Sequence, residues 1–211
     1  MSNNYRVRIR FSKTGDLRLI SHRDMVRAFE RLFRRAGVAL AMSQGFHPRP
    51  LMTFPDALSL GVEALDEAMD ITFADEIHPD ELKTLLQANC PQGLVIHSVR
   101  QLRPDERKAK IVSTVYEIDI PASVSLDKLN QAIDQLKRIT TLTVERKEKQ
   151  VELDLQATLG GVQLNDRRLV MNIRVIQQSQ LQPRDILAAL ELDTIVHEGN
   201  PLTRTKIELI P

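Results

Sequence analysis

Hydrophobic and polar residues alternate strictly over residues 5–11, near the start of the chain. This period of two predicts a strand with one buried face. The apolar side carries Tyr5, Val7, Ile9 and Phe11, and the other side carries Arg6, Arg8 and Arg10. We therefore expect three arginines to project from one face of a sheet.

The pattern changes to a helical period over residues 22–36. Ser21 can cap this helix, Asp24 stands at its third position, and Gly37 ends it. The apolar side, which predicts the core face, comprises Met25, Val26, Phe29, Leu32, Phe33 and Ala36. A different side carries Arg23, Arg27, Arg31 and Arg34. The helix is thus expected to bury one side and to display a row of arginines on another.

The remaining elements of the first hundred residues follow a known order. Residues 38–42 and 51–54 are expected to be extended on either side of a Gly/Pro-rich loop. Strands are predicted at 68–73 and 94–99, with a helix at 78–88 between them. Strand, helix, strand, strand, helix, strand is the split βαβ, or ferredoxin-like, order, in which two helices cover one face of an antiparallel sheet.

The same order returns after a polar segment at residues 101–111, which we predict to be a linker. Strands are expected at 112–120, 142–148, 150–156 or 169–176, and 204–210, with helices at 125–139 and 183–190. Gly160 and Gly161 are interpreted as part of a polar turn. The predicted fold class is α+β, with two tandem ferredoxin-like domains at residues 1–100 and 112–211.

Charge is distributed unevenly along the chain. Residues 1–50 hold eleven Lys/Arg against three Asp/Glu, a local charge of +8, and residues 51–99 hold nine Asp/Glu against one Lys, a local charge of −8. The whole chain carries only +1. The basic segment is expected to attract an anion, a polyanion or an acidic protein surface. The alternative is that some of its cations pair with the acidic segment that follows.

The sequence lacks the residues that several functional classes of protein require. Cys90 is the only cysteine, so the chain can form neither an internal disulfide nor a cysteine-ligated cluster by itself. Its five histidines are scattered, and no phosphate loop, nucleophile elbow or metal-spaced motif is present. We therefore predict no catalytic residues, no metal and no cofactor. The polar first residues and the absence of a long apolar run predict a cytoplasmic protein without a membrane partner.

The candidate binding residues fall into two groups. Phosphate contacts are expected from the strand, its following loop and the helix start: Arg8, Arg10, Lys13, Arg18, His22 and Arg23. Arginine on an open sheet face favours phosphate contact over base stacking. The second group lies in the loop and is expected to confer selectivity: Gln44, Phe46, His47 and Arg49.

Two alternatives apply to the loop. Pro48 and Pro50 stiffen it and Gly45 tolerates positive φ, so the loop can display its side chains at low entropic cost. It can equally be a rigid connector whose Phe46 plugs the core. His22 and His47 could also meet in space and act as acid and base on a phosphodiester.

Several stretches together resemble the radical-SAM-linked protein family. They are residues 8–24, 27–31, 34–37, 43–46 and 57–63, with a looser similarity that continues to the end of the chain. Where the family pattern has Phe-Asn-Pro-His-Pro, this chain has Phe46-His47-Pro48-Arg49-Pro50, and Arg23 replaces a residue that is usually apolar. The domain occurs as a separate protein or fused to the carboxyl end of a radical SAM enzyme. The resemblance implies such an enzyme as partner, and a connection to RNA or the ribosome.

Three functions are compatible with these features. The first is a non-catalytic accessory module that binds RNA or a ribonucleoprotein surface for a radical SAM enzyme. The second is a protein–protein adaptor that docks on that enzyme without nucleic acid. The third is a metal-independent enzyme that acts on an RNA phosphodiester through His22 and His47.

Overall fold

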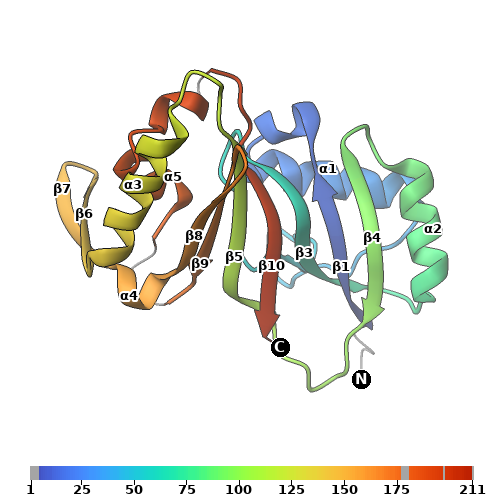
Figure 1. Ribbon diagram of the computed structural model, residues 1–211. Helices are drawn as coiled ribbons and strands as arrows, with labels where there is room; N and C mark the ends of the chain where they lie inside the picture. Colours follow the sequence, from blue (N-terminus) through green and yellow to red (C-terminus); the bar gives the residue numbers. More distant parts are fainter. Residues whose placement is uncertain (1–4, 177–180, 197, 211) are drawn as a thin grey trace. The chain divides into compact units, whose positions relative to one another are not determined.

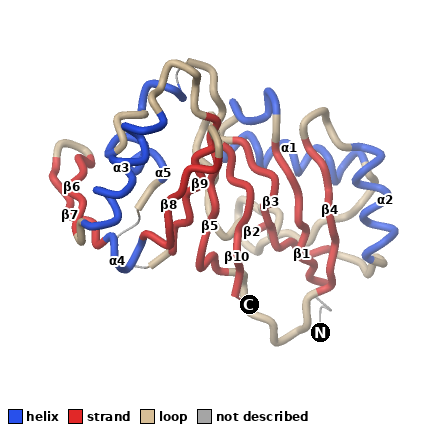
Figure 2. Tube along the Cα trace, in the orientation of Figure 1, coloured by secondary structure: helices blue, strands red, loops and turns tan. Residues whose placement is uncertain are grey.

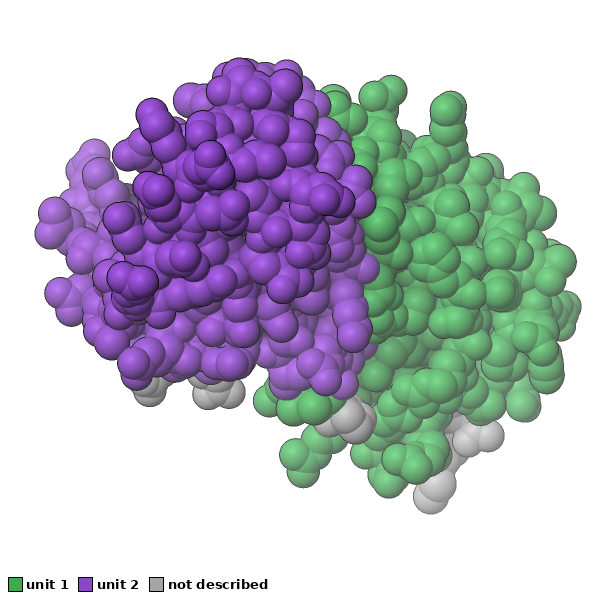
Figure 3. Space-filling model, in the orientation of Figure 1, with its two compact units in different colours: residues 1–110, 210–211 green, residues 111–209 purple. Residues whose placement is uncertain are grey.

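The computed structural model describes residues 5–176, 181–196 and 198–210. The chain divides into two compact units, one of residues 1–110 with 210–211 and the other of residues 111–209 (Figure 3). Both units combine helices with antiparallel strands, so the predicted α+β class is confirmed. Among the described helices, none is long and apolar enough to cross a membrane.

The first unit alternates strands and helices in the predicted order. Its elements are β1 (Tyr5–Lys13), the short 3-10 helix η1 (Gly15–Leu19), α1 (His22–Arg35), β2 (Met52–Thr53), β3 (Glu63–Phe73), α2 (Pro79–Asn89) and β4 (Leu94–Gln101). The strand order is β4-β1-β3, with β2 paired to β3, and each of these pairs is antiparallel. α1 and α2 lie on one face of these strands (Figure 1).

The core of the first unit lies between these helices and the apolar side of β1. Val7 pairs with Ile71 and Ile9 with Met69, so their side chains share one face of the sheet. Phe29 and Phe33 of α1 pack into the same cluster and are fully buried. The alternation that predicted β1 and the helical period that predicted α1 are both confirmed.

The ends of α1 also follow the sequence pattern. The Ser21 hydroxyl accepts a hydrogen bond from the Asp24 backbone N–H at 3.2 Å and donates one to the Asp24 carboxylate at 2.7 Å. Together with nearby Arg27, this bond lowers the pKa of Asp24. Ala36 is the C-cap, and Gly37 follows with φ of +71°. Glycine adopts that conformation without the steric cost that a Cβ would add.

The second unit contains an additional hairpin. Its elements are β5 (Lys110–Asp119), α3 (Leu126–Arg138), β6 (Thr141–Arg146), β7 (Lys149–Asp154), α4 (Leu155–Thr158), β8 (Leu159–Asn165), β9 (Arg168–Arg174), α5 (Pro183–Ala189), the 3-10 helix η2 (Asp193–Val196) and β10 (Thr203–Ile210). The strand order is β10-β5-β9-β8, and β6 and β7 form a separate two-stranded sheet (Figure 2).

The structure corrects two expectations for this unit. The strands predicted at 142–148 and 150–156 correspond to the separate β6–β7 hairpin, whereas the alternative at 169–176 corresponds to β9, in the main sheet. Gly160 and Gly161 lie in β8, not in a turn. A Cβ at Gly160 would come within 2.9 Å of the Asn172 side chain on β9, so a larger residue there would force that side chain to move.

Gly93 directly precedes β4 and lies against the backbone of Thr14, which directly follows β1. Its φ is +86°, a Cβ would lie 2.4 Å from the Thr14 carbonyl oxygen, and the Gly93 carbonyl accepts the Thr14 N–H at 2.8 Å. Gly37→Ala, where the φ is also positive but the space is open, should cost about 1–2 kcal/mol. Gly93→Ala should cost more, because the backbone must also shift. Urea unfolding of the two variants measures the difference, and equal losses would contradict this assignment.

Candidate functional site

The arginines of β1 lie on the face opposite the core, and two of them, Arg8 and Arg10, pair with carboxylates. Arg8 is 7% exposed, and its Nε and Nη2 donate to the two carboxylate oxygens of Asp70 at 2.7 and 3.0 Å. Arg10 donates in the same bidentate manner to Asp66, with 2.9 Å from Nε to Oδ1. Asp66 and Asp70 belong to β3, within the acidic stretch of the sequence. Part of the basic segment is therefore neutralised within the first unit.

Glu106 completes this arrangement from the segment that follows β4. Its carboxylate accepts Arg100 at 2.6 and 3.0 Å and lies 3.7 Å from Arg8, and its carbonyl oxygen accepts Arg6 Nη1 at 2.9 Å. Leu102 and Ala109 of the same segment are buried. Residues 102–109 thus act as more than a linker, because they place a carboxylate over the arginine face of β1.

The pH dependence of stability should report on Glu106. The Arg100 guanidinium lowers the pKa of this carboxyl from 4.5 to about 2. Its contribution to stability is therefore complete above pH 4.5 and is lost as the pH falls toward 2. The difference in unfolding free energy between wild type and Glu106→Gln should be constant near neutral pH and shrink across that window. A difference that does not change with pH would contradict the pairing.

Lys13 and His22 lie at the far end of β1 from Arg6. Lys13 is 3% exposed, and its Nζ lies 3.4 Å from the Ile20 carbonyl oxygen. His22 is exposed, and its ring packs edge-on against Phe54 with centroids 5.1 Å apart. Both residues line a cavity of about 20 Å³, enough for about one water molecule. Burial makes Lys13 a poor surface contact for a polyanion.

The exposed side of α1 carries the least compensated positive charge of the candidate residues. The α1 arginine ladder, as we call it, comprises Arg23, Arg27, Arg31 and Arg34, all exposed. At 100° per residue, it points away from the buried side of the helix. Arg27 lies 3.3 Å from Asp24, whereas the side chains of the other three make no ion pair or hydrogen bond within the described part of the chain. Arg18, half-buried in η1 before the helix, bonds locally to the Gly15 carbonyl at 3.1 Å.

The loop of residues 43–49 has an ordered base and an exposed tip. Met42 and Pro50 form an antiparallel bridge, the Ser43 N–H donates to the Arg49 carbonyl at 2.8 Å, and the Arg49 N–H donates to the Ser43 hydroxyl at 3.0 Å. The predicted loop residues Gln44, Phe46, His47 and Arg49 are all exposed. Because Phe46 is fully exposed, the alternative that it plugs the core is wrong. The stiff base holds an apolar ring in solvent.

The structure divides the candidate residues between two ends of the sheet. The extended segments on either side of the loop are bonded to β3 at Thr72 and Phe73. These two residues are opposite Arg6 and Tyr5, at one end of β1. His22 lies near Lys13 at the other end. Across the described residues, His22 and His47 share no hydrogen bond or ring contact. No cluster of three or more His, Cys, Asp or Glu side chains suited to a metal ion occurs in that part of the chain either.

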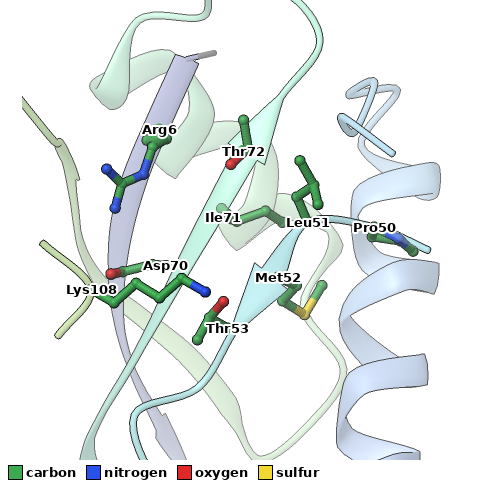
Figure 4. A pocket seen from close by; sticks show the side chains of 9 residues that line it. All are labelled: Arg6, Pro50, Leu51, Met52, Thr53, Asp70, Ile71, Thr72 and Lys108. Carbon is green, nitrogen blue, oxygen red and sulfur yellow. The ribbon is translucent and has the colours of Figure 1, made fainter. Parts of the chain in front are cut away.

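A cavity on the arginine face of the first unit was not indicated by the sequence. It has a volume of about 240 Å³ and is lined by Arg6, Pro50, Leu51, Met52, Thr53, Asp70, Ile71, Thr72 and Lys108 (Figure 4). Lys108 comes from the segment that also contains Glu106. The cavity forms because β2, β3 and this segment meet, which only the strand pairing reveals.

Comparisons with known proteins identify the family of the chain without assigning an activity. Among solved structures, the chain is similar to an unknown protein from Galdieria sulphuraria, at 11% identity and a TM-score of 0.30, over 99% of this chain and 100% of that one. It is also similar to a putative glycine cleavage system transcriptional repressor, at 12% identity and a TM-score of 0.25, over 99% of both chains. No curated protein matches. The model of DUF2344, described as an uncharacterized protein conserved in bacteria, matches residues 6–184. The chain therefore belongs to the DUF2344 family.

Proposed function

We propose that the chain is a non-catalytic module that binds RNA through the α1 arginine ladder and serves a radical SAM enzyme. One observation carries the proposal: Arg23, Arg31 and Arg34 are exposed on one side of a helix, and their side chains form no ion pair among the described residues. Other arginines of the same basic segment, such as Arg8 and Arg10, are held by carboxylates. A row of positively charged side chains without ion pairs is suited to bind a polyanion.

The dimensions of the ladder suit several phosphate groups. Its first and last arginines are eleven residues apart, which corresponds to about 17 Å along a helix. Arg18 and His22 precede the ladder and can extend the contact. In this proposal the β1 cations Arg8, Arg10 and Lys13 support the fold and do not contact the RNA.

The loop of residues 43–49 supplies selectivity in this proposal. A fully exposed Phe46 offers one face for a base to stack on, and Arg49 and Gln44 offer hydrogen-bond donors beside it. Stacking on an aromatic side chain contributes about 1–3 kcal/mol per base. Phe46→Ala should accordingly weaken binding to single-stranded RNA by roughly 5- to 100-fold, whereas Val95→Ala, at an exposed apolar residue of β4, should change it little. Equal effects in the two variants would contradict base stacking.

The fold is compatible with RNA binding, but it is not the main evidence for it. We infer that both units are ferredoxin-like. The strand order is β4-β1-β3-β2 in the first unit and β10-β5-β9-β8 in the second. The two orders are equivalent when the β6–β7 hairpin is treated as an insertion between α3 and β8. Related sheets bind RNA on the face that lacks helices. Here that face is occupied by ion pairs in the first unit, so the proposal uses the helical side.

The partnership with a radical SAM enzyme rests on the sequence resemblance. Cys90 is the single cysteine, so the cysteines that hold the iron–sulfur cluster would come from the partner. The chain would then present an RNA or a ribonucleoprotein surface to that enzyme.

Binding of the purified protein to a single-stranded RNA of about 20 nucleotides tests the proposal. Affinity should fall by at least tenfold between about 50 and 200 mM monovalent salt, because phosphate contacts release counterions. Absence of binding, or an affinity that does not depend on salt, would refute it. A pull-down that recovers the radical SAM enzyme unchanged after nuclease treatment, with no bound RNA, would favour the protein–protein adaptor instead.

A catalytic role for His22 and His47 has less support than either binding function. General acid–base catalysis needs both groups within hydrogen-bonding reach of one substrate. Cleavage of RNA by the pure protein that is lost in both His22→Ala and His47→Ala would nevertheless establish it.

A further inference from the structure

The cavity on the arginine face of the first unit is lined by donors that the protein does not use. Thr53, Thr72 and Lys108 make no side-chain hydrogen bond or ion pair within the described residues. Arg6 uses Nη1 for the Glu106 carbonyl and retains its other N–H groups. Thr72 is 8% exposed as a residue, and its hydroxyl makes no hydrogen bond to another described residue. Figure 4 shows the side chains of Arg6, Thr53, Thr72 and Lys108 around the same space.

We propose that this cavity binds the terminal phosphate of a phosphate monoester. Arg6 and Lys108 bring two positive charges, and a phosphate monoester carries about −1.5 to −2 at neutral pH. The guanidinium, the ammonium and the two hydroxyls provide donors from several directions, as a group with three terminal oxygens requires.

Asp70 also lines the cavity, but its charge is already compensated. Its two oxygens accept Nε and Nη2 of Arg8, and one of them also lies 3.3 Å from the Ala109 N–H. The contact with Ala109 fixes the backbone next to Lys108 and so helps to place the ammonium group. Asp70 therefore acts as a positioning residue, and the cavity keeps its net positive charge.

The size of the cavity limits what can enter. At about 240 Å³ it is smaller than the 300–1,000 Å³ of a pocket that encloses a drug-sized ligand. It can hold the phosphate and the group bonded to it, while the rest of the ligand stays outside. Leu51, which is partly exposed, gives that neighbouring group an apolar contact. Two sources share this chemistry: a free mononucleotide and the 5′ end of an RNA.

The inference does not depend on RNA binding by α1. Arg6 pairs with Thr72 and lies on the face of β1 opposite Val7, whose side chain packs toward the helices. The cavity and the α1 arginine ladder are therefore on different sides of the first unit and can be tested separately.

Titration calorimetry with adenosine 5′-monophosphate and with inorganic phosphate, at constant ionic strength, tests the site. Wild type should bind both, and Arg6→Gln or Lys108→Gln should each weaken binding by about tenfold or more. Thr72→Val should weaken it without a change of charge. Arg103→Gln, in the same segment as Lys108 but outside the cavity, is the matched control and should bind like wild type. Circular dichroism and urea unfolding verify that each variant is folded.

Two results would overturn the proposal: no binding of either ligand up to about 10 mM, or equal affinity in wild type and Lys108→Gln. A comparison of RNAs that carry a 5′-phosphate or a 5′-hydroxyl shows whether the site binds an RNA end or a free mononucleotide. A preference for the 5′-phosphate that Lys108→Gln abolishes assigns the site to an RNA end, and equal affinities with retained nucleotide binding assign it to a free nucleotide. A variant with Arg23→Gln, Arg31→Gln and Arg34→Gln should retain nucleotide binding. Failure of RNA binding by α1 is thus distinguishable from failure of this site.

Discussion

Asp70→Ala should lower the free energy of unfolding by about 3–5 kcal/mol, because it leaves the buried guanidinium of Arg8 without its bidentate partner. Only 8% of each side chain in this pair is exposed, so water solvates the remaining guanidinium less well than the carboxylate does. Glu106, 3.7 Å from Arg8, compensates only in part because Arg100 already occupies its oxygens. Urea denaturation of wild type and the variant measures the loss.

Asp66→Ala is the matched control for this prediction. Asp66 pairs with Arg10 in the same bidentate geometry, but about a quarter of each side chain is exposed, so the loss should be near the roughly 1 kcal/mol of a partly solvated pair. Replacing both members of the buried pair, as Arg8→Met with Asp70→Leu, should recover much of the stability because no unpaired charge remains. An Asp70→Ala protein as stable as Asp66→Ala would contradict the structural role assigned to Arg8.

Removing three arginines from α1 should produce the largest change in RNA binding. A variant with Arg23→Gln, Arg31→Gln and Arg34→Gln is expected to bind RNA on the order of 100-fold more weakly near 0.1 M salt, since each charge-assisted hydrogen bond contributes about 1.5–3 kcal/mol before solvent screening. Glutamine keeps the helix propensity, and the replaced side chains are exposed, so folding should be unaffected. Fluorescence anisotropy with a labelled RNA measures the affinity.

The second unit offers a control with the same change of net charge. Lys128, Lys137 and Arg138 are exposed cations of α3. Their combined replacement by glutamine also removes three positive charges but leaves the α1 arginine ladder intact. Binding should remain within a few-fold of wild type. Equal weakening in the two triple variants would mean that total charge, and not the surface of α1, determines affinity.

The local pattern of the sequence was sufficient to predict the elements that carry the α1 surface. Strict alternation identified β1 and its buried side, and the helical period with the Ser21 cap identified α1. Both signals depend on residues close together in sequence, and packing in the folded chain agrees with them. The exposed row of arginines followed from the same period.

Contacts between distant residues could not be predicted in this way. Arg8 and Asp70 are 62 residues apart, and their pairing depends on the register between β1 and β3. Glu106 and Lys108 lie in a segment with few apolar residues, which resembles a linker because its anchors are mostly polar. The β6–β7 hairpin has ordinary strand propensities, and nothing local distinguishes it from strands of the main sheet.

The most direct test of RNA binding by α1 is the slope of log Kobs against log salt concentration, compared between wild type and the two triple variants. Each phosphate contact to single-stranded RNA contributes about 0.7 to that slope. Removing Arg23, Arg31 and Arg34 should therefore flatten it by about 2, whereas the α3 replacements should leave it unchanged. An unchanged slope in the α1 variant would contradict the proposal that these arginines contact phosphate.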